Sequence, residues 1–271
     1  MRRQRWFEIH DQPWFPAPLR DRVTEALEAV WNGNRTYHPI ASRLREAVRH
    51  SGARQIVDLC SGGGGPWLGL YPEVADGQPL TVWLTDLYPN AILAGDLAAD
   101  LAIHSPLRAR AQPVDARAVP ADLPGFRTLF SSFHHFGPDS ARAMLADAFT
   151  HRQGIGIFEA ARCTPWTLLA VNAVPLLGLR EAARARPVRF RRLFWTFLVP
   201  VVPATLWLDG LLSCLRSYSL ADMAELTHGL TADDYAWQIG EAHGGRVPIR
   251  YLIGQPRTPC LRAESLAWNG E

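Results

Sequence analysis

Gln55-Ile-Val-Asp-Leu-Cys-Ser-Gly-Gly-Gly-Gly65 is the stretch of sequence that decides the fold. It has the pattern of a buried strand that ends near an acidic residue, Asp58, and runs into consecutive glycines. Thr81-Val-Trp-Leu-Thr-Asp86 is a second apolar strand with a carboxylate at its C-terminal tip. A glycine turn lets the backbone approach a bound nucleotide, and a carboxylate after the next strand can accept hydrogen bonds from a ribose diol. Together the two stretches predict half of a nucleotide-binding site.

The spacing of the glycines argues against two common kinds of nucleotide site. A dinucleotide fingerprint needs Gly-x-Gly-x-x-Gly, whose third glycine lets the helix pack tightly against the strand. Counted from Gly62 and Gly64, the third position is Trp67; counted from Cys60 and Gly62, the third is Gly65, but Cys60 then stands where the tight turn needs glycine. A phosphate loop is excluded because no Gly-Lys-Ser/Thr follows and the chain has no lysine. The turn therefore favours another nucleotide.

The spacing Asp58-x-x-x-Gly62-x-Gly64 resembles motif I of the class I S-adenosylmethionine (SAM)-dependent methyltransferases, usually Asp/Glu-x-Gly-x-Gly-x-Gly. Cys60 replaces the first glycine of that motif, so its Cβ must fit beside the turn without forcing a positive φ. The resemblance implies that SAM is the cofactor. It also implies that residues at and after the strand ends hold SAM, namely Asp58, Cys60, Ser61, Gly62, Gly64, Asp86 and Leu87.

Further elements follow in the order of that family, over roughly residues 36–160 and again from about 219. Ala111-Gln-Pro-Val-Asp-Ala116 is expected to be a short third strand, and the resemblance implies that Asp115 and Ala116 approach the adenine. Arg127-Thr-Leu-Phe-Ser-Ser-Phe-His-His-Phe136 is expected to be strand four and its loop, where many small-molecule methyltransferases carry paired histidines. Ser131 and Ser132 of this loop are predicted to contact the cofactor.

The next segments predict a helix and a fifth strand. Pro138-Asp-Ser140 has helix-start chemistry. Gly154-Ile-Gly-Ile-Phe-Glu159 has the pattern of a strand with a carboxylate at its tip. Between them, an apolar stripe recurs at helical spacing and should lie on the sheet: Ala141, Met144, Leu145, Ala148 and Phe149.

The resemblance implies an α/β fold with a doubly wound seven-stranded mixed sheet of order 3-2-1-4-5-7-6. Tyr235–Gly240 and Arg246–Gly254 are expected to be its last two strands, joined as an antiparallel hairpin. Ligands of such sheets bind beyond the carboxyl ends of the strands. The carboxyl ends of the strands thus form a ligand-binding rim. A flavodoxin-like sheet, a nicotinamide reductase or an inactive binding domain would have the same rim but would hold different ligands. The residues expected on this rim are Asp58, Gly62, Asp86, Asp115, Ser131, His134 and Glu159.

Residues 1–50 are predicted to form an N-terminal helical lid, and residues 51–271 the SAM-binding Rossmann-like domain. Apolar residues at helical spacing predict helices over 19–31 and 39–50. These helices either cover a sheet edge or, as the resemblance implies, also close over the cofactor. Tyr37, between them, is expected to contact the cofactor.

An apolar insertion at about residues 165–218 precedes the last two strands. Its uncharged run Leu193–Leu208 is shorter than the ~20 residues of a membrane span, and Pro200 and Pro203 interrupt it. A lone crossing would also put the two parts of the sheet on opposite sides of the membrane. The insertion is either ordinary core or a cap over the acceptor, and weak contact of its arginines and aromatic residues with a membrane surface is a lesser alternative. A cap would wall a pocket for a flat or apolar acceptor with Trp166, Phe194, Trp195 and Trp207.

Composition fits a soluble globular enzyme, with 48% hydrophobic and 20% charged residues among 271. The net charge of +2 gives no reason to expect a nucleic-acid partner. The four cysteines show no metal-ligand spacing, so neither a disulfide framework nor a metal site is expected. No apolar signal region follows the basic N-terminus, which makes the cytoplasm the expected location. The oligomeric state stays open.

The predicted function is SAM-dependent methyl transfer to a small, largely apolar or aromatic acceptor. A base that takes the acceptor's proton speeds such a reaction by about 10²–10⁴-fold. His134 or His135 is expected to be this base, with Glu159 as the next candidate; the alternative is that they only hydrogen-bond backbone or cofactor. Other functions kept open are a non-methylating alkyl transfer or cyclisation with SAM, a nicotinamide-dependent oxidoreductase, and a non-catalytic SAM-binding protein.

Overall fold

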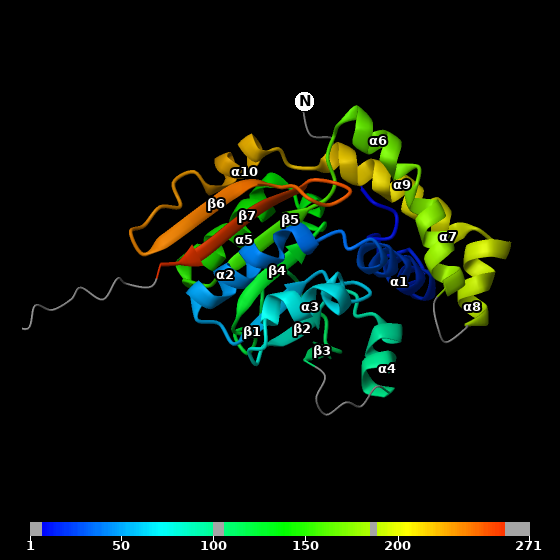
Figure 1. Cartoon of the computed structure of the whole chain (residues 1–271), viewed down its shortest axis with the longest axis horizontal. Helices are drawn as coiled ribbons and strands as arrows, with labels where there is room; N and C mark the ends of the chain where they lie inside the picture. The colour runs from blue at the N-terminus through cyan, green and yellow to red at the C-terminus, as the bar shows by residue number, and fades with distance from the viewer. Residues whose placement is uncertain (1–6, 100–105, 185–188, 258–271) are drawn as a thin grey trace, which may run out of the picture.

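The computed structural model describes residues 7–99, 106–184 and 189–257, and its centre is a seven-stranded sheet (Figure 1). The strand order is β3-β2-β1-β4-β5-β7-β6. Strands β1 to β5 run parallel, and β7 is antiparallel to both β5 and β6. This confirms the predicted doubly wound mixed sheet. The strands are β1 Gln55–Leu59, β2 Thr81–Thr85, β3 Leu107–Ala109, β4 Phe126–Phe130, β5 Ile155–Glu159, β6 Tyr235–Ala242 and β7 Ile249–Pro256.

Helices cover both faces of the sheet because successive side chains of a strand point to opposite faces. Ile56 of β1 packs in the core that α2 (Ala41–Ser51) and α3 (Trp67–Ala75) share with the sheet. Its neighbour Val57 packs in the opposite core, with α5 (Pro138–Thr150) and α10 (Leu220–Thr227). The apolar stripe predicted from the sequence is the buried face of α5, with Ala141, Met144, Leu145 and Ala148 buried.

A third group of helices lies beside the sheet, at one end of the molecule (Figure 1). It consists of α1 (Ala17–Gly33) and the helices of the insertion, and it has its own small core of Phe15, Val23, Val202 and Leu206. Helix α1 packs against α7 and α9, so the insertion meets the N-terminal helix. The insertion comprises α6 Pro165–Val171, α7 Val174–Arg184, α8 Phe190–Leu193, the π-helical turn η3 Phe194–Leu198 and α9 Val201–Arg216.

The third strand is not where the sequence predicted it. Residues Leu107–Ala109 pair with β2, whereas 111–116 form a loop beyond the strand. A ladder hydrogen bond to β2 comes from Arg110 N, which donates to the Leu84 carbonyl at 3.0 Å, whereas Pro113, in the middle of the expected strand, has no N–H to donate. The loop still follows β2, because Val114 N donates to the carbonyl of Asp86 at 2.8 Å.

No single helix in the described part of the chain has both the length and the apolar character needed to cross a membrane. Segments Phe190–Leu198 and Val201–Arg216 reach these criteria only together, and they are bent by 65°. Strands β5 and β7, which flank the insertion in the sequence, pair directly in the sheet.

Candidate functional site

The glycine turn after β1 has the backbone conformation that motif I requires. Gly62, Gly64 and Gly65 have positive φ, and so does Cys60, with φ of 57°. The expectation that Cys60 would avoid a positive φ is therefore wrong: the cysteine adopts the left-handed conformation of the glycine that it replaces. For a residue with a Cβ this costs about 1 kcal/mol. Burial raises the pKa of the Cys60 thiol, which argues against a role as a thiolate nucleophile.

Asp58 and Ser61 fix the glycine turn through hydrogen bonds on the side of the sheet. The buried Asp58 carboxylate accepts hydrogen bonds from Thr128 Oγ1 at 2.6 Å and Ser61 Oγ at 2.7 Å. Ser61 N donates to the carbonyl of Thr85 at 2.9 Å, which ties the turn to β2. Burial raises the pKa of Asp58 to about 7, although these hydrogen bonds lower it. Both residues thus position the turn from inside the sheet.

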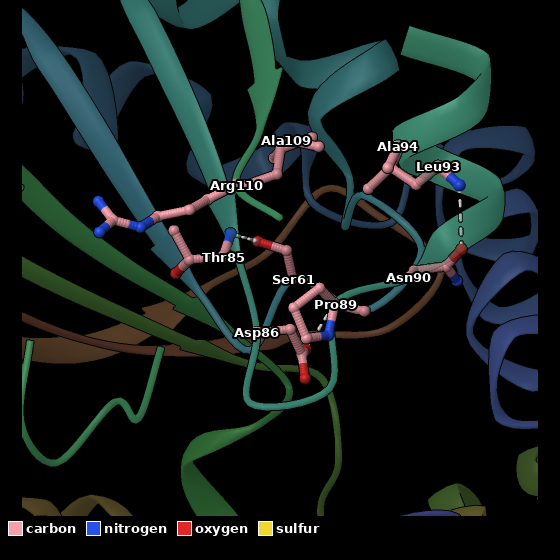
Figure 2. A pocket seen from close by; sticks show the side chains of 11 residues that line it. Ser61, Thr85, Asp86, Pro89, Asn90, Leu93, Ala94, Ala109 and Arg110 are labelled. Carbon is pink, nitrogen blue, oxygen red and sulfur yellow. Dashed lines mark hydrogen bonds between the residues drawn. The ribbon is translucent and has the colours of Figure 1, made fainter. Parts of the chain in front are cut away.

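Asp86 lies at the tip of β2 beside the glycine turn (Figure 2). Its Oδ2 accepts the Gly62 N–H and its Oδ1 accepts the Tyr88 N–H, both at 2.8 Å. Each carboxylate oxygen has a second lone pair, so the carboxylate can still accept hydrogen bonds from a ribose. Residues of the turn, β2, α4 (Ala91–Ala99) and the end of β3 enclose a cavity here of about 10 Å³, lined among others by Ser61, Asp86, Leu93 and Arg110.

Helix α1 closes the glycine turn from outside. A Cβ added to Gly63 would lie 2.6 Å from the carbonyl oxygen of Thr24. Asn32 of α1 donates to the Gly65 carbonyl at 3.1 Å and accepts the Gly69 N–H at 2.8 Å. The donor set fits SAM in its chemistry, but pockets for molecules of this size have volumes of about 300 Å³ or more. The cavity at Asp86 is therefore too small to hold SAM in this conformation, and α1 covers the neighbouring glycine turn.

Tyr37 lies behind the site, in the core. Its side chain is 1% exposed, packs edge-on against Phe130 and donates from its hydroxyl to Ser131 Oγ at 2.6 Å. Ser131, which follows β4, has a positive φ of 43° and also accepts the Ala160 N–H at 3.1 Å. Tyr37 thus fixes the turn after β4, and in this conformation it does not line the cavity at Asp86.

The residues expected at the adenine are on the loop after β3. Asp115 is held by Arg117, with 2.6 Å between Oδ2 and Nη2, and this hydrogen bond lowers the pKa of the carboxyl. Leu87 is 44% exposed, whereas Ala116 and Ser132 are buried. Contact of these four residues with a cofactor stays a prediction.

His134, His135 and Glu159 do come together, beyond the ends of β4 and β5. Glu159 is fully buried; its Oε1 accepts the Phe133 N–H at 2.8 Å, and its Oε2 lies 2.6 Å from His134 Nδ1. The other side of both imidazoles faces Glu8, which the sequence did not single out. Glu8 lies 3.2 Å from His134 Nε2 and 3.3 Å from His135 Nε2.

A second layer of charged residues surrounds this group. Asp11 Oδ2 lies 2.6 Å from His135 Nδ1, and Asp209 Oδ2 lies 2.6 Å from His10 Nδ1. Arg216 Nη1 lies 3.7 Å from Glu8 Oε1. We refer to Glu8, His10, Asp11, His134, His135, Glu159, Asp209 and Arg216 as the imidazole–carboxylate cluster.

The carboxylates of the cluster favour protonated imidazoles. Burial alone would lower the pKa of His134, but Glu159 and Glu8 outweigh it and raise this pKa to about 10. Burial likewise opposes protonation of His10, whose pKa is raised to about 9 chiefly by Asp209. His134 is 1% exposed and carries a proton at neutral pH, so it is poorly suited to take one from an acceptor. The side chain of His135 is 20% exposed and is the more accessible of the two imidazoles.

The four aromatic residues of the insertion do not enclose the cavity at Asp86. Trp166 is 80% exposed and Trp207 is 43% exposed, with its indole N–H donating to Asn172 Oδ1 at 2.9 Å. Phe194 and Trp195 pack edge to face, and Trp195 also packs on the small core shared with α1. An acceptor pocket walled by these rings stays a prediction. Weak membrane-surface contact, to which the exposed Trp166 and Trp207 would contribute, also stays a prediction.

No protein-family model matches the sequence, and no curated protein is detectably similar to it. Among solved structures, human N-acetylserotonin methyltransferase in complex with SAM matches with a TM-score of 0.50 and 14% identity, over 90% of this chain and 57% of that chain. Mitomycin 7-O-methyltransferase matches with a TM-score of 0.43 and 19% identity, over 80% of this chain and 53% of that chain. A Rhodobacter sphaeroides protein provisionally assigned to the zinc-dependent alcohol dehydrogenases matches with a TM-score of 0.46 and 14% identity, over 88% of this chain and 98% of that chain.

This chain thus spans little more than half the length of the two methyltransferases. The match to human N-acetylserotonin methyltransferase, at a TM-score of 0.50, shows a shared fold and leaves substrate and activity open.

Proposed function

We propose that this chain, which has the fold of the class I SAM-dependent methyltransferases, transfers the methyl group of SAM to a small acceptor with an apolar or aromatic body. The observation that carries the proposal is the glycine turn with positive φ at Cys60, Gly62 and Gly64, hydrogen-bonded to Asp86. Strand β1 lies between β2 and β4 in the sheet, where the strand order reverses and where ligands of such sheets bind.

The residues at the carboxyl ends of β1 and β2 would hold the cofactor. Asp86 has lone pairs for a ribose diol, and the glycines let the backbone approach it closely. SAM, when bound, supplies a methyl group that its sulfonium already activates. The protein then has to place the acceptor nucleophile in line with the methyl group and exclude water. Its contribution to the rate comes mostly from this orientation of the reacting groups. Helix α1, which covers the turn, is placed to exclude water.

His135 is the proposed proton acceptor for the metal-free protein. Asp11 lies 2.6 Å from its Nδ1 and Glu8 lies 3.3 Å from its Nε2, so an acceptor that gives its proton to Nε2 has to displace the Glu8 carboxylate from this nitrogen. His134, enclosed by Glu159 and Glu8, is instead proposed to position the loop. An acceptor whose proton is removed at this place would have a hydroxyl or an amine as its nucleophile.

The nicotinamide-dependent alternative has less support. Trp67 stands where one dinucleotide register needs its third glycine, and this side chain is fully buried against Phe130 at the start of α3. A side chain of this size prevents the close helix–strand approach that the third glycine permits. A non-methylating use of SAM and binding without catalysis stay open, since both would use the same turn.

Isothermal titration calorimetry tests the cofactor directly. We expect SAM or S-adenosylhomocysteine to bind and NADH and NADPH not to bind. Asp86→Ala should weaken SAM binding by about 1.5–3 kcal/mol because a charge-assisted hydrogen bond to the ribose is lost. Asp234→Ala is the matched control, since this exposed carboxylate pairs with Arg152 far from the turn in sequence and should leave affinity unchanged. Tight NADH binding without SAM binding would overturn the proposal.

A further inference from the structure

Three side chains of the imidazole–carboxylate cluster present metal-ligand atoms to one another. Among the described residues, Glu8, His134 and His135 each offer one such atom, and these atoms lie within 4.8 Å of each other. The Glu8 carboxylate stands 3.2 Å from His134 Nε2 and 3.3 Å from His135 Nε2. Ligand atoms around a single ion are separated by comparable distances, because metal–nitrogen bonds are about 2.0–2.1 Å long.

The opposite nitrogen of each imidazole is held by a carboxylate. His134 Nδ1 lies 2.6 Å from Glu159 and His135 Nδ1 lies 2.6 Å from Asp11. Metal-bound histidines almost always donate their other N–H to such a group, which fixes the tautomer and leaves the ligating nitrogen unprotonated. Glu159 is itself fixed, because its second oxygen accepts the Phe133 N–H at 2.8 Å. The outer layer of a metal site is therefore already built.

The charges of the cluster also suit a cation. Four carboxylates, those of Glu8, Asp11, Glu159 and Asp209, face a single guanidinium in the cluster, that of Arg216. With neutral imidazoles this group has excess negative charge in a largely buried place, where charge has to be compensated. A divalent ion between the Glu8 carboxylate and the two imidazoles would supply this compensation.

We propose that Glu8, His134 and His135 bind a divalent transition-metal ion through the Glu8 carboxylate and Nε2 of each histidine. Two imidazoles and one carboxylate favour zinc, iron(II) or a similar ion, whereas magnesium and calcium prefer oxygen ligands alone. Three protein ligands leave at least one coordination position for a small molecule. Metal binding itself is independent of the proposed methyl transfer. Its role there, which rests on the proposed function, is to lower the pKa of a bound acceptor hydroxyl in place of His135.

The experiment titrates the chelator-treated full chain with Zn²⁺, and with Co²⁺ as a spectroscopic probe, in the absence of SAM and acceptor. We expect one ion per chain, cobalt absorption bands that report nitrogen and oxygen ligands, and affinity that rises with pH because the ion displaces protons. Glu8→Gln and His135→Gln should each weaken binding by about 100-fold or more, and Asp11→Asn by about 10-fold through the outer layer.

His38→Gln is the matched control, because His38 Nδ1 forms a similar pair with Glu73 outside the cluster, at 2.5 Å. Its metal affinity should equal that of the wild type. Circular dichroism identifies any variant that fails to fold. If the ligand variants do not fold, the test rests on Asp11→Asn, which removes no metal ligand. Absence of stoichiometric binding to the wild type, or unchanged affinity in all three cluster variants, overturns the proposal. A chain that binds zinc but not SAM would overturn only the methyltransferase function.

Discussion

Cys60 holds a conformation that glycine adopts at lower energy. Cys60→Gly should remove left-handed strain of about 1 kcal/mol, offset by the greater backbone entropy that glycine loses on folding. We therefore expect the free energy of unfolding to change by less than about 1 kcal/mol and SAM affinity to stay within a few fold. Cys60→Val should destabilise the fold by more than that, because a β-branched residue tolerates positive φ poorly.

Urea denaturation and calorimetry measure both quantities, and Cys163→Gly, at a partly exposed cysteine outside the turn, serves as the control. Loss of folding in Cys60→Gly would show that the thiol is needed for packing and that the conformation of the turn does not explain the residue.

Asp58 makes the stability of the fold depend on pH. Burial raises the pKa of Asp58, whereas the hydrogen bonds from Thr128 and Ser61 lower it. Burial has the larger effect, and the pKa rises from 3.8 to about 7. The folded protein thus favours the neutral acid, so this contribution to stability is complete below pH 3.8 and is lost as the pH rises through about 7. A difference of this size corresponds to about 4 kcal/mol at most.

Asp58→Asn cannot ionise and should remove this dependence. The free energy of unfolding of the wild type minus that of Asp58→Asn should fall between pH 4 and pH 8, measured by urea denaturation. Asp234→Asn, at an exposed carboxylate, should show no such trend. A constant difference across this range would mean that Asp58 is already ionised at low pH in the folded protein.

Helix α1 covers the glycine turn, and we expect it to control access to the turn. Asn32 joins α1 to the turn through the Gly65 carbonyl and the Gly69 N–H. Asn32→Ala should weaken the closed arrangement and lower stability by about 1–2 kcal/mol. Because a larger open population raises apparent affinity, SAM should associate faster and bind more tightly. Stopped-flow association and amide exchange of α1 measure these changes.

Asn34→Ala is the control for α1. The side chain of Asn34 donates to the Val30 carbonyl at 2.7 Å, within the same helix. This change should lower helix stability without changing SAM association. Equal association rates in wild type and Asn32→Ala would mean that the cavity opens without movement of α1.

The elements with strong periodicity could be predicted from the sequence. The buried strand after Gln55 and four of the five residues in the stripe of α5 follow from strand and helix geometry, and both elements were confirmed; Phe149, the fifth, is only partly buried. The third strand was misplaced because Leu107–Ala109 is too short to show a period, while Pro113 lies in a more strand-like run. Residues 7–15 have no period, so nothing indicated that Glu8 and Asp11 would reach the site.

At the scale of the whole molecule, the candidate site combines residues that sequence spacing cannot relate. The rule that ligands bind beyond strand ends predicts Asp86, His134 and Glu159 at one edge of the sheet, and His134 and Glu159 contact each other there. Glu8 and Arg216 reach the same place through the packing of the N-terminal segment and α9. No metal site was expected because the cysteines lack metal-ligand spacing. That spacing carries no information about the proposed site, whose ligands are two histidines and a glutamate.

The contact between Ile9 and Asp209 has a consequence for synthesis of the chain. The Ile9 N–H donates to Asp209 Oδ1 at 2.7 Å, and the two residues are 200 positions apart. A ribosome that adds ~5–20 residues per second leaves this segment without its partner for roughly 10–40 s. The parallel strands β1 to β5 are all made within that interval, whereas α9 is not. A nascent chain stalled before α9 would thus lack the contacts of the N-terminal segment with Asp209 and Arg216, although His134 and His135, which also contact Glu8, have already been made.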